Sequence, residues 1–173
     1  MARAAGAALT TPAGPTDLAH LGEVLGRSQL WGLELEPRYR VLAVTLELAP
    51  EDGPWPLGDD RRVQLLCHPV STILGSLRRF DTGEAQVVTF EVEQLVEVAA
   101  AFGGSTLTAP VFGRPEPRPG QWGPRFSLEG RSSAPDGRTR TVSIEVADAA
   151  ARLEVFVRCD TLEVRDATGQ PLT

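Results

Sequence analysis

The turn Pro135-Asp136-Gly137 lies between two segments in which apolar and polar residues alternate. A Pro-Asp-Gly sequence favours a type I turn whose glycine takes the left-handed conformation, and this predicts a tight antiparallel hairpin. The apolar side chains of both segments then share one face, so we expect a half-buried antiparallel sheet. The register set by the turn pairs Phe126 with Val146, Leu128 with Ile144 and Gly130 with Val142.

The segment from Leu153 to Cys159 extends this hairpin, because its odd positions are mostly apolar. We expect a third strand here, which turns the hairpin into a meander. Further along, the apolar residues Leu162 and Val164 stand at even positions. Either a bulge at 159–161 accounts for this change, or Leu162 and Val164 serve another face. The pairs expected between the second and third strands are Val146 with Leu153, Ile144 with Val155 and Val142 with Val157.

A separate hairpin is expected nearer the N-terminus, on both sides of Pro37. Apolar residues alternate with polar residues or glycine before this proline, and the even positions from 42 to 48 are apolar after it. Pairing Glu36 with Tyr39 brings all these apolar residues to one face. The pairs that follow are Leu33 with Leu42 and Trp31 with Val44.

The remaining pattern predicts helices and further strands. Arg62 to Cys67 reads as a strand, and the apolar residues in 70–77 suit either a helix or a bent edge strand that continues past Pro69. Residues 91–102 carry an apolar stripe and end at two glycines, which predicts the main helix of the chain. A short helix is expected to begin at 15–17.

Together these elements predict an α+β fold. A mainly antiparallel sheet of about six to eight strands carries the helix 91–102 on one face, with a minor N-terminal helix. Residues 1–15 are expected to form a tail and 16–173 a single globular domain. No apolar run approaches the roughly 20 residues of a membrane span, and the first 15 residues lack the apolar centre of a signal peptide. We therefore expect a cytoplasmic protein without a membrane partner.

Charge and composition argue against nucleic acid as a partner. All 17 cationic residues are arginine, and the chain contains neither lysine nor asparagine, a bias typical of a GC-rich bacterial genome. Arginine abundance is therefore weak evidence for phosphate binding, and the net charge of −6 repels polyanions. We interpret the pairs Arg61–Arg62 and Arg78–Arg79 as solvated element ends.

The sequence also indicates neither a metal nor a cofactor. Cys67 and Cys159 lie in apolar stretches, which predicts a buried, reduced pair. His68 adjoins Cys67, but two Cys and two His lack any metal-binding spacing. The loop 51–60 holds four carboxylates without the order of a calcium loop, so we expect an acidic turn whose Trp55 covers the edge of the core.

Catalytic motifs are missing as well, and no nucleophile, phosphate-binding loop or carboxylate pair stands out. The leading hypothesis is a non-catalytic protein-interaction module, with a protein partner or self-association. Tryptophan and arginine are enriched where partners are gripped, and the proline-rich run 109–124 is long for a loop. The alternative is a small-ligand-binding protein or an enzyme, whose pocket between helix and sheet collects His68, Arg158 or Glu154. The expected partner-binding residues are Trp55, Arg114, Arg118 and Trp122.

Overall fold

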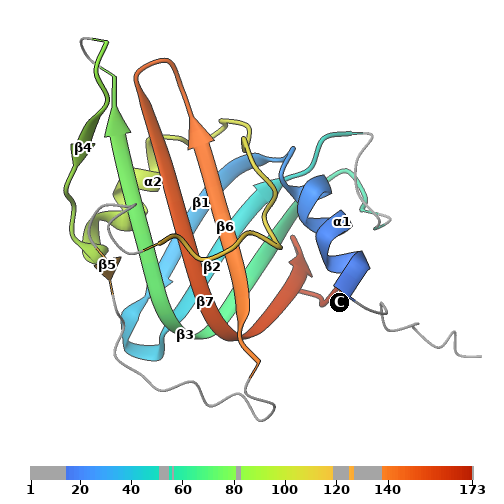
Figure 1. The fold of residues 1–173 in the computed structure, drawn as a ribbon. Coiled ribbons are helices and arrows are strands. Elements are labelled where there is room, and N and C mark those ends of the chain that lie inside the picture. The colour runs from blue at the N-terminus through green and yellow to red at the C-terminus, as the bar shows by residue number, and fades with distance from the viewer. Residues whose placement is uncertain are drawn as a thin grey trace, which may run out of the picture.

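Two long strands, β3 (Arg62–Arg79) and β7 (Ala151–Asp166), form the centre of an antiparallel sheet. The computed structural model describes residues 15–50, 55, 57–80, 83–118, 125–126 and 138–172. Its sheet has seven strands in the order β1-β2-β3-β7-β6, with β4 and β5 also paired to β3 (Figure 1). The other elements are α1 (Pro15–Leu25), β1 (Gln29–Glu36), the 3-10 helix η1 (Pro37–Tyr39), β2 (Val41–Glu47), β4 (Gln86–Val88), the 3-10 helix η2 (Val92–Gln94), α2 (Leu95–Ala100), β5 (Arg125–Phe126) and β6 (Arg140–Ala147).

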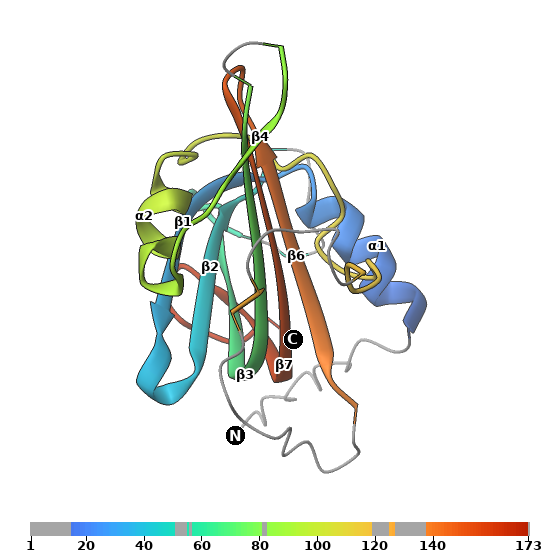
Figure 2. The same cartoon turned by 60° about the vertical axis from the view of Figure 1, so that its left-hand side comes forward.

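Both central strands bend sharply at the same level, so the sheet folds over on itself (Figures 1 and 2). We call the part formed by β1, β2, residues 62–67 and residues 162–166 the back layer. The front layer consists of residues 70–79, residues 151–159, β6, β4 and β5. The inner faces of the two layers share one buried core, to which Leu25 of α1 and Leu95 of α2 also contribute. Strands that pass from one layer to the next at a bend are a common way to build such corners.

The bend explains why the apolar residues of β7 change from odd to even sequence positions. In β7 the inward positions change from odd to even between Cys159 and Leu162, and in β3 they also change from odd to even between Cys67 and Val70. Cys67 pairs with Leu162 and Val70 with Cys159, so the two strands stay in register there. The register shifts one step later, between Val70 and Thr72. The expected bulge at 159–161 is therefore wrong, because the irregularity lies on β3. The alternative of another face is also wrong, since Val164 belongs to the same core as Cys159.

Residues 104–108, which we call the closing segment, join the two outer strands of the sheet. The Leu30 amide donates to the Ser105 carbonyl at 2.9 Å, and the Leu107 amide donates to the Ser28 carbonyl at 2.9 Å. On the other side, the Thr108 amide donates to the Glu145 carbonyl of β6 at 2.8 Å. The edges of β1 and β6 are thus bonded to one segment at this end, which satisfies backbone groups that an open edge exposes.

The predicted α+β class with a mainly antiparallel sheet is confirmed, but the expected main helix over 91–102 is not. That region forms η2 followed by α2, which has six residues, and α1 with eleven residues is longer. A capping box between Glu91 and Gln94 tightens the first turn. Two glycines stop the helix, and Gly104 has a positive φ of 83°. Within the described ranges, no helix has the length and apolarity needed to cross a bilayer.

The meander prediction is confirmed for its second half. The three expected pairs between β6 and β7 are all present. For 70–77 the helix alternative is wrong and the strand that continues past Pro69 is confirmed. It is not an edge strand, because β7 pairs with it on one side and β4 and β5 pair with it on the other. The pairing of Phe126 with Val146 is wrong: Phe126 pairs with Ile73, because Val146 already has Leu153 on one side and Leu107 on the other. The Pro135-Asp136-Gly137 turn, with Leu128 and Gly130, lies outside the described residues.

The N-terminal hairpin is confirmed, but its register differs by two residues. Leu33 pairs with Val44, and Glu36 pairs with Val41, not with Tyr39. The reason is a longer turn, in which η1 is followed by Arg40 in the left-handed conformation with a φ of 52°. The pairing of Trp31 with Val44 is therefore also wrong.

Gly26, which follows α1, packs closely against Ala109 and Pro110. A Cβ atom at Gly26 would lie 2.6 Å from the Ala109 carbonyl oxygen, which is backbone and cannot turn aside. We expect Gly26→Ala to lower the free energy of unfolding by about 1–3 kcal/mol in chemical denaturation. Gly32→Ala is the control, because a Cβ atom at Gly32 would have no neighbour within 4 Å, and we expect it to change stability by less than about 0.5 kcal/mol. Equal effects at both glycines would contradict this packing.

Candidate functional site

A hollow of about 460 Å³ lies on the outer face of the back layer. Its walls and floor come from four strands, which present polar side chains on this face because the opposite face is buried in the core. The volume falls within the range of ligand-binding clefts. The residues that line it are Trp31, Glu34, Thr45, Arg62, Val63, Gln64, Asp166, Ala167, Thr168 and Gly169.

Trp31 forms one wall because a bulge turns it outward. Leu30 pairs with Leu46 and Gly32 pairs with Thr45, so Trp31 is the extra residue between two successive pairs. Leu30 and Leu33 are both buried, whereas the Trp31 residue is 55% exposed. A bulge lets β1 keep its leucines inside on both sides of this point while it presents the indole to solvent.

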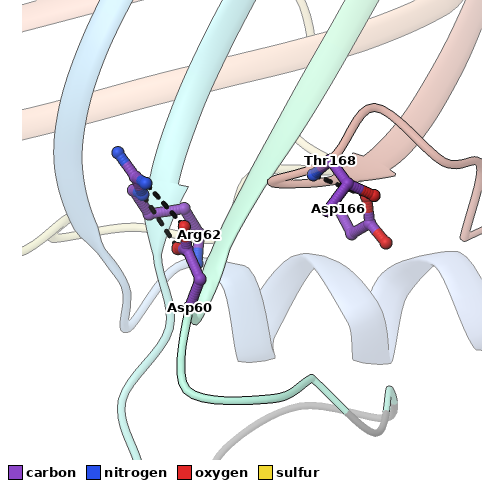
Figure 3. A network of polar contacts seen from close by, with 4 residues as sticks. All are labelled: Asp60, Arg62, Asp166 and Thr168. Atoms are coloured by element: carbon purple, nitrogen blue, oxygen red, sulfur yellow. Dashed lines mark hydrogen bonds and ion pairs between the residues drawn. The ribbon is translucent and has the colours of Figure 1, made fainter.

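Arg62 holds the Trp31 ring in place. Its guanidinium lies 5.2 Å from the ring centroid, a cation–π geometry. The same guanidinium binds the Asp60 carboxylate through two hydrogen bonds, Nε to Oδ1 at 2.8 Å and Nη2 to Oδ2 at 2.5 Å (Figure 3). Hydrogen bonds from the Arg62 side chain and backbone lower the pKa of Asp60 to about 2. Asp60 is therefore ionised at any physiological pH and keeps Arg62 oriented.

The opposite wall is a turn that Asp166 organises. Its Oδ1 atom accepts hydrogen bonds from the Thr168 hydroxyl at 2.7 Å and the Thr168 amide at 2.8 Å (Figure 3). The same atom accepts a hydrogen bond from the Gln170 amide at 2.9 Å. These hydrogen bonds, the Thr168 hydroxyl first, lower the pKa of Asp166. Gly169 completes the turn with a φ of 84°. The wall is thus held by local bonds and does not depend on distant parts of the chain.

The floor can donate and accept hydrogen bonds. Thr45 of β2 and Gln64 of β3 are cross-strand partners, and both are partly exposed. Glu34 stands exposed on the Trp31 wall. Among the described residues that line the hollow there is no serine, cysteine or histidine. The described lining residues thus present one aromatic ring, one guanidinium, two carboxylates and the three neutral polar side chains of Thr45, Gln64 and Thr168.

The pocket expected between helix and sheet is not assembled from its three candidate residues. His68 bonds Glu163 on the outer face of the back layer, with Nε2 and Oε1 3.0 Å apart. Arg158 forms an ion pair with Glu116 on the front layer. Glu154 is buried on the front layer, where it pairs with Ser76 of β3 and Glu145 of β6. None of the three lines the hollow.

Of the four expected partner-binding residues, Trp55, Arg114 and Arg118 do not line the hollow. Trp55 is half-buried and packs against the core, as expected for a residue that covers its edge. Arg114 donates to Glu145 at 2.7 Å, so it binds its own domain. Arg118 is exposed and has an interaction partner, and Trp122 lies outside the described residues. Trp31 was not predicted as a site residue, although Gly32 beside it is a signal for a bulge.

Residues 109–118, which we call the crossing segment, pack on the outer face of the front layer. The Val111 amide donates to the Gly22 carbonyl of α1 at 2.9 Å, and the Val111 carbonyl accepts the Ser143 amide of β6 at 2.8 Å. Val111 and Phe112 are buried. Figure 1 shows the segment running across β6 and β7. This part of the proline-rich run thus contacts its own domain.

Glu145 fastens the crossing segment through a buried carboxylate. It binds Arg114 of the crossing segment, Arg152 of β7 and the hydroxyl of Thr108. Burial raises the pKa of Glu145, but hydrogen bonds from Arg152, Thr108 and Arg114 outweigh it and leave the pKa below its ordinary value. The ionised form is therefore the form that the fold stabilises.

Cys67 and Cys159 are buried and reduced, as expected. Their thiols are hydrogen-bonded to each other, and this bond together with burial raises the pKa of Cys67. The described residues contain no group of three or more His, Cys, Asp or Glu arranged to hold a metal ion. The pair thus belongs to the packing at the bend of β3 and β7.

Comparisons of the chain with models of protein families, with curated proteins and with solved structures find no match. Any function must therefore be inferred from the residues themselves.

Glu145→Gln tests the role of the buried carboxylate. We expect a loss of about 1–3 kcal/mol in the free energy of unfolding at pH 7, because two guanidinium groups lose their charged partner. The folded pKa is lowered, so the stabilisation is present above the unfolded pKa of about 4.3 and is lost as pH falls through the folded pKa. The variant should lose less stability than the native protein over that acidic range.

Denaturation curves between pH 2 and pH 7 measure both effects. Glu23→Gln, at an exposed position of α1, is the control and should change stability by less than about 0.5 kcal/mol. If Glu145→Gln were as stable as this control at pH 7, the carboxylate would not be what fastens the crossing segment.

Proposed function

We propose that the protein is a non-catalytic binding module that holds a segment of a protein partner in the hollow beside Trp31. The observation that carries this proposal is the exposed indole, which a bulge turns away from the core and an arginine holds in one orientation. Tryptophan and arginine are the residues most enriched at energetic hot spots of interfaces. An aromatic ring that is already ordered loses little conformational entropy on binding.

The floor of the hollow suits a polypeptide. Thr45 and Gln64 offer donors and acceptors side by side, as peptide groups require. The hollow lies open on a sheet face, so a partner can lie across several strands. A second copy of the chain is the other protein that can occupy this surface, and the size of the protein in solution distinguishes the two.

A binding role also agrees with the state of the carboxylates. Asp60 is engaged by Arg62, and the Oδ1 atom of Asp166 is engaged by its turn. Both pKa values are lowered, whereas a general acid at neutral pH needs a raised one. The proposal places the module in the cytoplasm, where buried thiols such as Cys67 and Cys159 remain reduced.

Trp31→Ala is the test of this proposal. We expect the amount of partner retained by the immobilised protein, in extract of its native cytoplasm, to fall at least about tenfold. The free energy of unfolding should change by less than about 1 kcal/mol, because the ring is mostly exposed. Quantitative mass spectrometry of the retained proteins and chemical denaturation measure the two effects.

Trp55→Ala is the matched control. This half-buried ring packs against the core, so its removal should cost about 2 kcal/mol of stability and leave partner retention unchanged. Retention that survives Trp31→Ala, or that falls equally in both variants, would contradict the proposed surface. Sedimentation at several concentrations identifies self-association if a second copy is the occupant.

A further inference from the structure

The outer face of the back layer carries more negative than positive charge around the hollow. Glu34 stands on the Trp31 wall and Asp166 on the opposite wall. Glu47 is the cross-strand partner of Arg62, so it lies on the same face. With Asp60 and Glu163 added, the described residues place five carboxylates in this region, together with the guanidinium groups of Arg62 and Arg165 and the imidazole of His68.

Both guanidinium groups already have anionic partners. Arg62 is bound by Asp60 through two hydrogen bonds. Arg165 is bound by Glu163, with Nη2 and Oε2 2.6 Å apart, and the same carboxylate also contacts His68. The positive charge on this face is thus matched locally, while Glu34 and Glu47 add negative charge beside it.

Three of these carboxylates are held in the charged form by hydrogen bonds. Hydrogen bonds lower the pKa of Asp60, of Glu163 and of Asp166, so none of the three becomes protonated near neutral pH. A surface of one sign attracts ligands of the opposite sign over several ångströms. The negative charge of these three carboxylates is therefore present throughout the neutral pH range.

Trp31 adds a second preference for cations. Its ring already has the Arg62 guanidinium 5.2 Å from the centroid, and an indole face attracts cations through its quadrupole. The residue is still 55% exposed, so the indole retains surface that a ligand can cover. Glu34 lines the same wall and offers a carboxylate to whatever binds there.

We infer that the partner segment held in the hollow is basic, and that an arginine or lysine of this segment lies against Trp31 with its charge next to Glu34. The inference rests on the proposed function and adds the chemistry of the partner to it. Charge complementarity of this kind speeds encounter and selects between partners more than it adds affinity.

Three ten-residue synthetic peptides, with blocked ends, test the inference directly: alternating Arg-Ser, alternating Glu-Ser and alternating Gln-Ser. Nuclear magnetic resonance records the Trp31 indole signal and the Thr45 and Gln64 amide signals during titration of the full chain. We expect saturable shifts at these three positions with the Arg-Ser peptide alone. Its dissociation constant should rise at least about fivefold when sodium chloride is raised from about 50 to about 300 mM.

Paired charge-neutralising variants separate the hollow from general attraction to an acidic protein. Glu34→Gln should weaken binding of the Arg-Ser peptide by about three- to tenfold. Glu84→Gln removes the same charge at an exposed position that does not line the hollow, and it should leave the dissociation constant unchanged within about 1.5-fold. Equal effects of the two variants would overturn the inference.

The outcomes also separate this inference from the proposed function. If the Glu-Ser or Gln-Ser peptide shifts the three signals as strongly as the Arg-Ser peptide, the partner need not be basic, and the inference fails while the binding role stands. The inference fails in the same way if no peptide shifts the signals but Trp31→Ala still releases the natural partner. If Trp31→Ala releases nothing and no peptide binds, both are wrong.

Discussion

The pairing of β3 with β7 is the interaction on which the rest of the structure depends. It runs without interruption from Val63 with Asp166 to Arg79 with Ala151, apart from one register shift. Because both strands bend together, this ladder supplies strands to both layers and encloses the core between them. It also places Arg62 and the 166–169 turn at the same end of the sheet. The side of the hollow opposite Trp31 is therefore positioned by this pairing.

The sequence predicted strand pairing correctly where the alternation of apolar and polar residues alone determines the register. The β6–β7 register was correct because Val142, Ile144 and Val146 can be buried only against the matching face of Leu153–Cys159. The β1–β2 register was wrong, since it depends on the length of a turn, and a left-handed Arg40 gives little warning in sequence. The partner of Phe126 was wrong because alternation alone does not show whether β6 or β3 lies beside it.

The candidate site was hidden for a related reason. Trp31 continues the alternation of Leu33 and Leu35, so the two-residue period of a strand predicts that it faces the core. The one-residue bulge between Leu30 and Gly32 turns it to the solvent instead. The loop residues Trp55 and Arg114 resemble binding residues in composition, but the structure uses the first against the core and the second to fasten the crossing segment. Residue type indicates what a side chain can do, whereas only the register decides which face it occupies.

The closing segment has a consequence for how the chain is synthesised and folded. It joins Ser28–Leu30 to Glu145, and β6 leaves the ribosome after most of the protein. Contacts between residues this far apart in sequence form slowly. The edge of β1 near Leu30 therefore acquires its hydrogen-bonding partners late in folding. Glu34 and Glu36 lie along the rest of this strand, where repeated negative charge discourages two unfinished chains from pairing edge to edge.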